Sequence, residues 1–283
     1  MTYAAVPVLA SNPNLSAIWN ALLASREYDF RQRPHAQKSG MLAGMALTKK
    51  QGGSDLRSHT TAAGGGPIEG GQICRLTGHK WFCSAPMSDM FLILEQAPAG
   101  PSCFLVPRVL DDGTRDPIAL QRLKDKLGNR SNASAEIELD GTWCVCVDQE
   151  GRGIRTVLDM VAATRLGCIL GSSATMRQAL VRAIHHTRHR QAFGRWVVDQ
   201  PTDAQCPHGP GPGIRSRHHF GSPACCGCRR QRHGVLPVGG RRAVGKYWVC
   251  KRETPMVAKA LECLGEMALS RRTAWHGCAA KPR

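Results

Sequence analysis

A proline-free stretch from Ile154 to Gln191 constrains this chain more than any other feature. Its apolar side chains recur at a period near 3.6, which is the period of a helix with one buried face. A helix of that length is unusual in a globular domain and typical of a helical bundle. The residues that set the period are Val157, Met160, Val161, Leu166, Ile169, Leu170, Met176, Leu180, Val181 and Ile184. We therefore predict that residues 151–201 contain the first long helix of a bundle.

The preceding segment, residues 41–150, shows short apolar runs separated by turns rather than a helical period. Several short strands at this spacing favour an antiparallel barrel or sandwich. Candidate strands are 72–76, 90–94, 102–106, 135–139 and 143–147, with Asp140-Gly141 among the turns that separate them. Residues 1–40 contain one predicted amphipathic helix, with Leu15, Ile18, Trp19, Leu22 and Leu23 at helical spacing behind Asn12-Pro13.

Composition places the chain among globular proteins. Its 283 residues allow one large domain or two ordinary ones. No run of about 18 apolar residues occurs, and Met1–Leu9 lacks the basic start of a signal peptide. We therefore expect a cytoplasmic protein with no membrane span, in which scattered cysteines are small core side chains.

The net charge of +17 suggests a nucleic-acid partner, but its distribution weakens that interpretation. Residues 202–283 hold 15 Lys and Arg against 4 Asp and Glu, whereas the first 201 residues hold 23 against 17. The cluster Arg229-Arg230-Gln231-Arg232 has no interleaved aromatic side chain. Most of the excess charge thus lies where the sequence looks least like a folded domain.

Residues 202–242 have too many Pro and Gly for a bundle and no alternation for a sheet. Back-translation offers an explanation, because a one-nucleotide shift turns the Pro-Gly repeat of 209–213 into codons for Leu and Ala. A second shift after Gly265 gives a glycine-containing loop in place of Glu266-Met267-Ala268. We interpret 202–242 as a frameshifted segment and 243–283 as a helix followed by an aberrant tail.

A zinc module is the alternative interpretation of this segment. It would use Cys206, Cys225, Cys226, Cys228, His208, His218 and His219. Structural zinc sites pair their ligands as C-x2-4-C and H-x3-5-H, with apolar residues between the pairs. Adjacent cysteines among Gly-Pro pairs do not fit that spacing, and we predict no metal site.

Two motifs within 41–150 suit a flat polar ring. The segment Thr48–Ser54, TKKQGGS, has hydroxyls at both ends and a Gly-Gly turn where backbone can approach a ligand closely. The segment TGHKWFCSAP, 77–86, is a strand in which alternation would place Trp81 and Cys83 on one face. A plain hairpin and an ordinary core tryptophan are the alternatives for each motif taken alone.

Together these motifs resemble the flavin-binding middle domain of the acyl-CoA dehydrogenases. The stretch LKDKLGNRSNAS, 123–134, is similar to the alkylation-response (AidB-type) branch of that family, and HRQAFG, 189–194, resembles its R-x-x-F-G motif. The resemblance covers 1–201 and 243–265. It implies an α+β fold, with a remnant of an N-terminal helical domain over 1–40, a β-barrel flavin-binding domain over 41–150, and part of a C-terminal helical bundle.

The resemblance also implies FAD as cofactor, an acyl-CoA substrate and a homo-oligomer. In the family, Arg190 would bind the pyrophosphate of a neighbouring subunit's FAD, for which a guanidinium fork is well suited. Arg165 would lie near the acyl-CoA, although a surface salt bridge is an equal alternative. The implied cofactor residues are Met45, Thr48, Gly53, Ser54, Lys80, Trp81, Arg190 and Phe193, and the implied substrate residues are Arg165 and Ser54.

The chain also departs from the family pattern. The family often has Glu after the threonine, where this chain has Lys49. The Gly-Asn-Gly that should follow Leu261–Gly265 is replaced, and the W-E-G motif that supplies the family's catalytic glutamate is not in the chain. We therefore expect an acyl-CoA dehydrogenase-like flavoprotein fragment with impaired or no turnover. A basic DNA-associated protein of the alkylation response, without catalysis, is the alternative.

Overall fold

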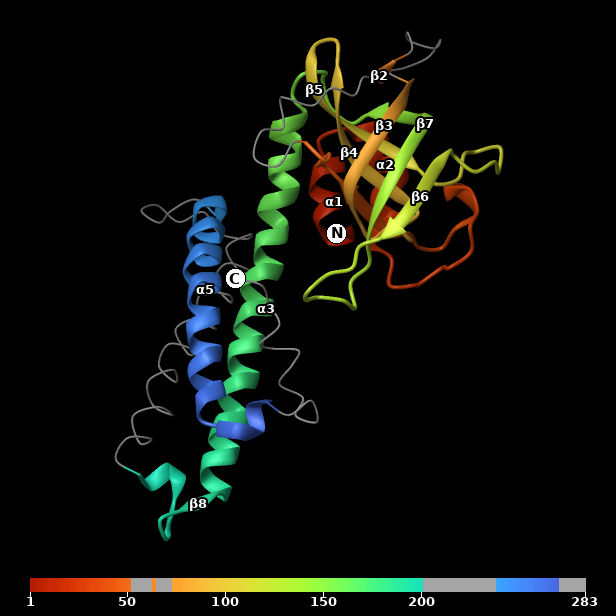
Figure 1. The fold of residues 1–283 in the computed structure, drawn as a ribbon. Coiled ribbons are helices and arrows are strands. Elements are labelled where there is room, and N and C mark those ends of the chain that lie inside the picture. Colours follow the sequence, from red (N-terminus) through yellow and green to blue (C-terminus); the bar gives the residue numbers. More distant parts are fainter. Residues whose placement is uncertain (52–62, 65–72, 201–237, 270–283) are drawn as a thin grey trace. The chain divides into compact units, whose positions relative to one another are not determined.

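The computed structural model describes residues 1–51, 63–64, 73–200 and 238–269, which form two compact units (Figure 1). Unit 1 contains the described residues up to Asp125 and from Arg130 to Ala163. Unit 2 contains Lys126–Asn129 and the described residues from Thr164 onward. The predictions for Gly53, Ser54 and residues 202–237, including the zinc alternative, lie outside the described residues.

Unit 1 begins with two helices where the sequence predicted one: α1, Thr2–Leu9, and α2, Pro13–Ala24. The Asn12 side chain caps α2 by accepting hydrogen bonds from the backbone of Asn14 and Leu15, at 3.1 and 3.2 Å, and Pro13 occupies the first turn. Helix α1 was missed because it is short and contains a proline. Its apolar side chains Ala4, Ala5, Val8 and Leu9 are buried in the core, and tertiary packing stabilises what local propensity does not.

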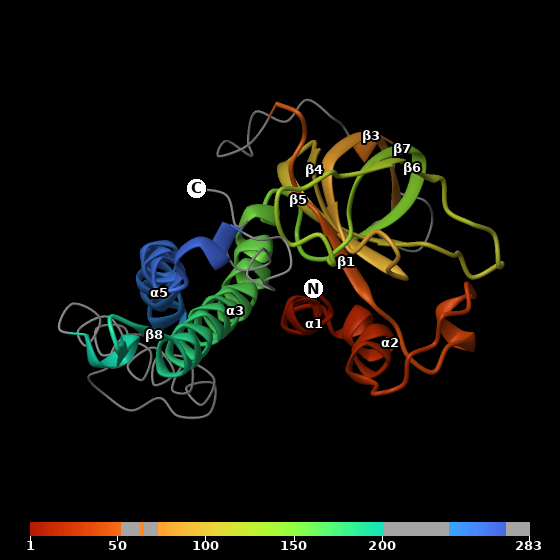
Figure 2. The ribbon, with the colours of Figure 1, turned by 60° about the horizontal axis from the view of Figure 1, so that its bottom comes forward.

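A seven-stranded sheet makes up the rest of unit 1, in the order β2-β3-β1-β4-β5-β7-β6. An additional pairing of β3 with β7 closes it into the predicted β-barrel (Figure 2). The β1–β4 pair is parallel and the other pairs are antiparallel. The strands are β1 Ala43–Ala46, β2 Ala63–Gly64, β3 Ile73–Ser84, β4 Met90–Ala97, β5 Gly100–Pro107, β6 Ile118–Leu123 and β7 Ser134–Cys146.

Strand β4 shows how the sequence builds two cores around one sheet. Side chains on a strand alternate between its faces, so Met90, Leu92 and Leu94 join a cluster with α1, α2 and the start of the long helix. Phe91 and Ile93 face the barrel interior, where they pack against residues of β5 and β7. Because both faces are covered, β4 is apolar along nearly its whole length, as strands buried on both sides are.

Two local predictions about the barrel were wrong, and a β-bulge is the reason in each case. Asp140-Gly141 is not a turn, because β7 runs through it, with Gly141 at φ +64° beside a register shift in the β3–β7 ladder. A second shift falls between Lys80 and Cys83. The side chains of Lys80 and Cys83 are both buried. Trp81 and Cys83 therefore lie on different faces of β3, not on one face as alternation predicted.

Unit 2 is built on the predicted long helix, α3, Gly153–His189, whose first residues belong to unit 1. After α3 the chain forms a small hairpin of β8, Gln191–Ala192, and β9, Arg195–Trp196, and then the short helix Val197–Asp199. Helix α5, Val238–Glu262, and the turn Gly265–Leu269 follow. The core of this unit joins Ile169, Met176, Ala179, Leu180 and Ala183 of α3 to Val249, Met256, Val257 and Ala260 of α5.

The helix predicted from Ala243 is therefore confirmed and begins five residues earlier. Among the described helices, α3 is long and apolar enough to cross a membrane when judged by length and composition, a test that core helices of water-soluble proteins also pass. The five-part division of the chain into domains stays a prediction.

Candidate functional site

Three of the predicted cofactor residues lie together where β1 meets β3. Met45 pairs with Ser84 in the antiparallel β1–β3 ladder. Just past the end of β1, the carbonyl oxygen of Thr48 accepts a hydrogen bond from the backbone N–H of Trp81, at 2.9 Å. Thr48 and Trp81, 33 residues apart in the sequence, are thus joined by a direct backbone bond that links the two motifs.

Lys80, the neighbour of Trp81, lies inside the barrel. Its side chain is fully buried, and its Nζ donates to the carbonyl oxygens of Leu94 and Leu47, at 2.5 and 3.3 Å. The same Nζ lies 3.0 Å from Oε1 of Glu95 on β4. Burial lowers the pKa of Lys80 to about 8, and the attraction of Glu95 opposes that fall. This ammonium is thus already bonded within the described residues.

Lys49, the neighbour of Thr48, also points into the barrel interior. Its Nζ lies 3.1 Å from Oε2 of Glu95, and both side chains are almost fully buried. Neither Lys49 Nζ nor the two Glu95 oxygens makes a hydrogen bond of good geometry among the described residues. At these distances the charges still attract each other, because ion pairing depends weakly on angle. Lys49, Glu95 and Lys80 are called the buried ion cluster below.

Trp81 is half-buried on the outer side of the barrel and surrounded by cations. Lys124 Nζ lies 3.1 Å from the centroid of the indole ring, and Lys50 Nζ and the Arg122 guanidinium carbon lie at 5.3 and 5.6 Å. Glu136 pairs with Arg122 and Lys124, at 2.6 and 2.7 Å. Cations this close to an aromatic face interact favourably with it. The outer side of β3 therefore combines an aromatic plane with positive charge.

In unit 2, the R-x-x-F-G motif forms the β8–β9 hairpin. Phe193 and Gly194 occupy its tip with φ of +55° and +73°, the signs that a two-residue type I′ turn requires. Phe193 is 98% exposed. The backbone carbonyl of Arg190 accepts from Val197 N–H, at 2.9 Å, and its exposed side chain is not used in that bond.

Arg190 also lies near the segment after α5. A Cβ built on Gly265 would be 3.7 Å from Arg190 Nη1. Leu261–Gly265 is the segment that resembles the start of the family's cofactor loop, so unit 2 brings that segment and the predicted pyrophosphate ligand together. Arg165 is half-buried on α3, also in unit 2.

Sequence reasoning missed Glu95 and Lys124. A signal existed for Glu95, since it is the one charged residue in the largely apolar strand MFLILEQA. A carboxylate in such a strand needs a cation nearby, but the sequence does not say which one. Lys124 was noted only as part of the stretch 123–134, because its contact with Trp81 depends on how β6 and β3 both pair with β7.

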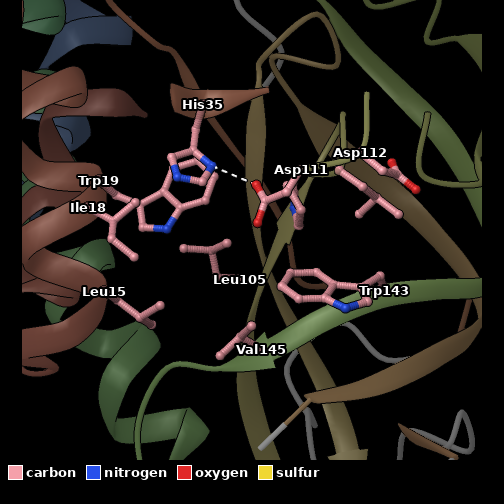
Figure 3. Close-up of a pocket in the computed structure, with 11 residues that line it drawn as sticks. Leu15, Ile18, Trp19, His35, Leu105, Asp111, Asp112, Trp143 and Val145 are labelled. Atoms are coloured by element: carbon pink, nitrogen blue, oxygen red, sulfur yellow. Dashed lines mark ion pairs between the residues drawn. The ribbon is translucent and has the colours of Figure 1, made fainter. Parts of the chain in front are cut away.

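A separate cavity of about 370 Å³ lies in unit 1 between α2 and strands β5 and β7 (Figure 3). Leu15, Trp19, Leu105 and Val145 give it apolar walls. His35 Nδ1 and Asp111 Oδ1, 3.0 Å apart, form an ion pair on its wall. None of the predicted cofactor or substrate residues that the structure describes lines this cavity.

Comparison with known proteins agrees with this geometry. Residues 44–142 match the family model described as acyl-CoA dehydrogenase, middle domain, and residues 151–204 match acyl-CoA dehydrogenase, C-terminal domain. The chain belongs to the acyl-CoA dehydrogenase family. The predicted family and the α+β fold with a barrel followed by a helical region are thereby confirmed.

Two curated proteins show how far along the chain the similarity extends. The chain is 42% identical to the AidB protein of Escherichia coli strain K12 over 281 residues, which covers 94% of this chain and 49% of AidB. It is 31% identical over 223 residues to acyl-CoA dehydrogenase family member 11 of Caenorhabditis elegans, covering 72% of this chain and 34% of that protein. The chain thus spans half the length, or less, of these curated relatives.

Solved structures show the same fold at lower identity. The C. elegans ACDH-11 complex with C11-CoA has a TM-score of 0.86 at 24% identity, covering 99% of this chain and 49% of that one. A glutaryl-CoA dehydrogenase from Mycobacterium smegmatis in complex with FADH2 has a TM-score of 0.74 at 18% identity, covering 98% and 66%. These likenesses establish the fold.

Proposed function

We propose that this chain is an FAD-binding portion of an acyl-CoA dehydrogenase-like flavoprotein. The observation that carries the proposal is the Thr48–Trp81 backbone bond, which places the two flavin-type motifs side by side within the matched middle domain. An M. smegmatis family structure contains FADH2, and the C. elegans one contains an acyl-CoA. FAD would be the cofactor and an acyl-CoA the substrate class.

The available side chains fit an isoalloxazine ring and a diphosphate. Trp81 offers a half-buried aromatic plane, and Lys50, Arg122 and Lys124 supply positive charge beside it. Met45, Thr48, Gly53 and Ser54 would line the ring from the β1 side. Arg190 would bind the pyrophosphate of a neighbouring subunit with Phe193 packed beside it, so the proposal includes a homo-oligomer. Arg165 and Ser54 would contact the substrate.

When bound, FAD would supply the hydride acceptor for oxidation of the CH–CH bond of an acyl-CoA. The chain's own residues would bind and orient the cofactor, with cations countering negative charge on the ring and diphosphate. We further propose that turnover is impaired, because the C-terminal domain match ends at residue 204. A cytoplasmic location belongs to the same proposal, and the described cysteines are all free thiols, as expected in a reducing compartment.

The proposal is tested by flavin titration. The purified protein should bind FAD, measured by absorbance and by quenching of flavin fluorescence. Trp81→Leu and Arg190→Gln should each weaken binding about tenfold or more, because each loses a stacking or charge-assisted contact. Trp248→Leu is the control, since that tryptophan lies on α5 and stacks with Arg252. Equal affinities in all four proteins would contradict the proposed site.

DNA association is the second candidate, and one observation favours it. Single-stranded nucleic acids bind where aromatic side chains and cations alternate, and Trp81 and Phe82 both lie beside Lys124. Binding of labelled single-stranded DNA should then be lost in Lys124→Ala and survive deletion of 202–237. Loss on that deletion alone would attribute binding to the excess charge of that segment.

A further inference from the structure

We propose that Glu95 is a positioning residue for the cofactor site: from inside the barrel it holds Lys49 and Lys80, and thereby fixes the hydrogen-bonded pair Thr48 and Trp81. The assignment of these two residues to a cofactor site rests on the proposed function. The positioning itself rests on the geometry of the described residues.

The argument begins with the order of residues along two segments. Lys49 follows Thr48, and Lys80 precedes Trp81. Lys49 is buried against Glu95, whereas Thr48 beside it is only half-buried. On β3, Lys80 lies inside the barrel and Trp81 on the outer side, as alternation along a strand requires. Strand β4 supplies the third member, since Glu95 has the parity of Phe91 and Ile93, which face the barrel interior. One carboxylate thus reaches both segments from inside the barrel.

The distances show that Glu95 bridges the two segments. Its Oε2 lies 3.1 Å from Lys49 Nζ and its Oε1 lies 3.0 Å from Lys80 Nζ. Between them, the Thr48 carbonyl and the Trp81 N–H make their bond of 2.9 Å. Lys80 adds bonds to the carbonyl oxygens of Leu47 and Leu94. The segment after β1 is therefore held on β3 by the Thr48–Trp81 backbone bond, by a bond from Lys50 N–H to His79 Nε2 at 3.4 Å, and by the buried ion cluster.

The charge balance makes Glu95 the essential member. The cluster has two ammonium groups and one carboxylate, all nearly excluded from water. Without Glu95, two like charges would remain buried close together, an arrangement that costs far more than the loss of a surface pair. Relief would come from moving Lys49 and its segment outward or from loss of the Lys80 proton. Either response would disturb the Thr48–Trp81 bond.

The test removes the carboxylate at position 95 and, in a second variant, restores a carboxylate at position 49. Glu95→Gln removes the charge, and the double variant Lys49→Glu/Glu95→Gln returns a carboxylate to the same interior space with a single lysine to pair. Glu138→Gln is the matched control, because Glu138 is an exposed carboxylate of β7 bonded to Gln121. The double variant carries no excess buried charge and should fold even if the single variant does not.

The first measurement is hydrogen exchange of the Trp81 amide, with the amide of Phe104 in the barrel core as internal reference. Exchange at Trp81 relative to Phe104 should accelerate about tenfold or more in Glu95→Gln and return to within about threefold of wild type in the double variant. Unchanged exchange in the single variant, or no recovery in the double variant, would overturn the positioning role. Glu138→Gln should match wild type.

The second measurement is FAD affinity in the same four proteins. If Glu95 positions the cofactor residues, the dissociation constant should rise about tenfold in Glu95→Gln and recover in the double variant. If the exchange rate of the Trp81 amide changes in Glu95→Gln but the dissociation constant for FAD does not, the link between Glu95 and the cofactor site is overturned. A wild-type protein with no affinity for FAD would instead contradict the proposed function, and the exchange results would still decide the positioning role.

Discussion

Replacement of Asp116 by asparagine should make unit 1 more stable at neutral pH and leave it nearly unchanged in acid. Asp116 is 5% exposed, and its Oδ1 accepts a hydrogen bond from the backbone N–H of Trp143, at 2.8 Å. Its Oδ2 has no hydrogen-bond partner among the described residues. Burial raises the pKa of Asp116 to about 6 against the opposing bond from Trp143. Asparagine keeps the Oδ1 acceptor and carries no charge.

The magnitude follows from linkage. Because the folded-state pKa is raised, the contribution of Asp116 to stability is fully present below its ordinary value of 3.8 and is lost as pH rises through about 6. A pKa difference of about 2 corresponds to at most about 3 kcal/mol over the whole range. Between pH 4 and pH 8 the wild type should therefore lose about 2 kcal/mol relative to Asp116→Asn.

The assay is urea unfolding of both proteins at pH 4 and pH 8, followed by hydrogen exchange of peptides from β7, which reports on unit 1 alone. Carboxylates other than Asp116 titrate in both proteins and cancel in the difference. The asparagine amide adds a pH-independent offset, so the change of the difference with pH is the decisive quantity. A difference that stays constant within about 0.5 kcal/mol would refute the raised pKa and the burial on which it depends.

Three further predictions test packing and exposure. Gly44→Ala should destabilise unit 1 by about 1–3 kcal/mol, because its new methyl would lie 2.5 Å from a ring carbon of Phe91. Gly171→Ala should stabilise α3 by about 1 kcal/mol, because no atom of the described residues lies within 4 Å of its new methyl, and calorimetry of both variants checks the two signs. Exposed Cys168 should be alkylated quickly at pH 8 and Cys103, whose pKa burial raises to about 12, only on unfolding, as peptide mapping would show. Phe193→Ser should change the free energy of unfolding by less than about 0.5 kcal/mol, since the ring is exposed, and a larger loss would mean that the hairpin tip packs on the protein.

Local patterns in the sequence predicted the helices of unit 2 and the family. The predicted start of the long helix, Ile154, is within one residue of Gly153, where α3 begins. The agreement is close because a 3.6-residue period can be recognised from consecutive residues. The motifs around Thr48 and Trp81 could also be recognised, since each is one contiguous segment of the sequence. The strand candidates at 90–94 and 102–106 fell within β4 and β5 for the same reason.

Tertiary structure decided what the patterns left open. Two β-bulges turned a predicted turn into continuous strand and moved Cys83 to the face opposite Trp81, because bulges depend on the partner strand. The sequence showed an isolated glutamate at position 95 and two lysines elsewhere, and only the pairing of β1 with both β3 and β4 made them neighbours. Periodicity and motifs are properties of adjacent residues and can be read directly. Pairing of buried charges across strands depends on strand order and register, which no single segment contains.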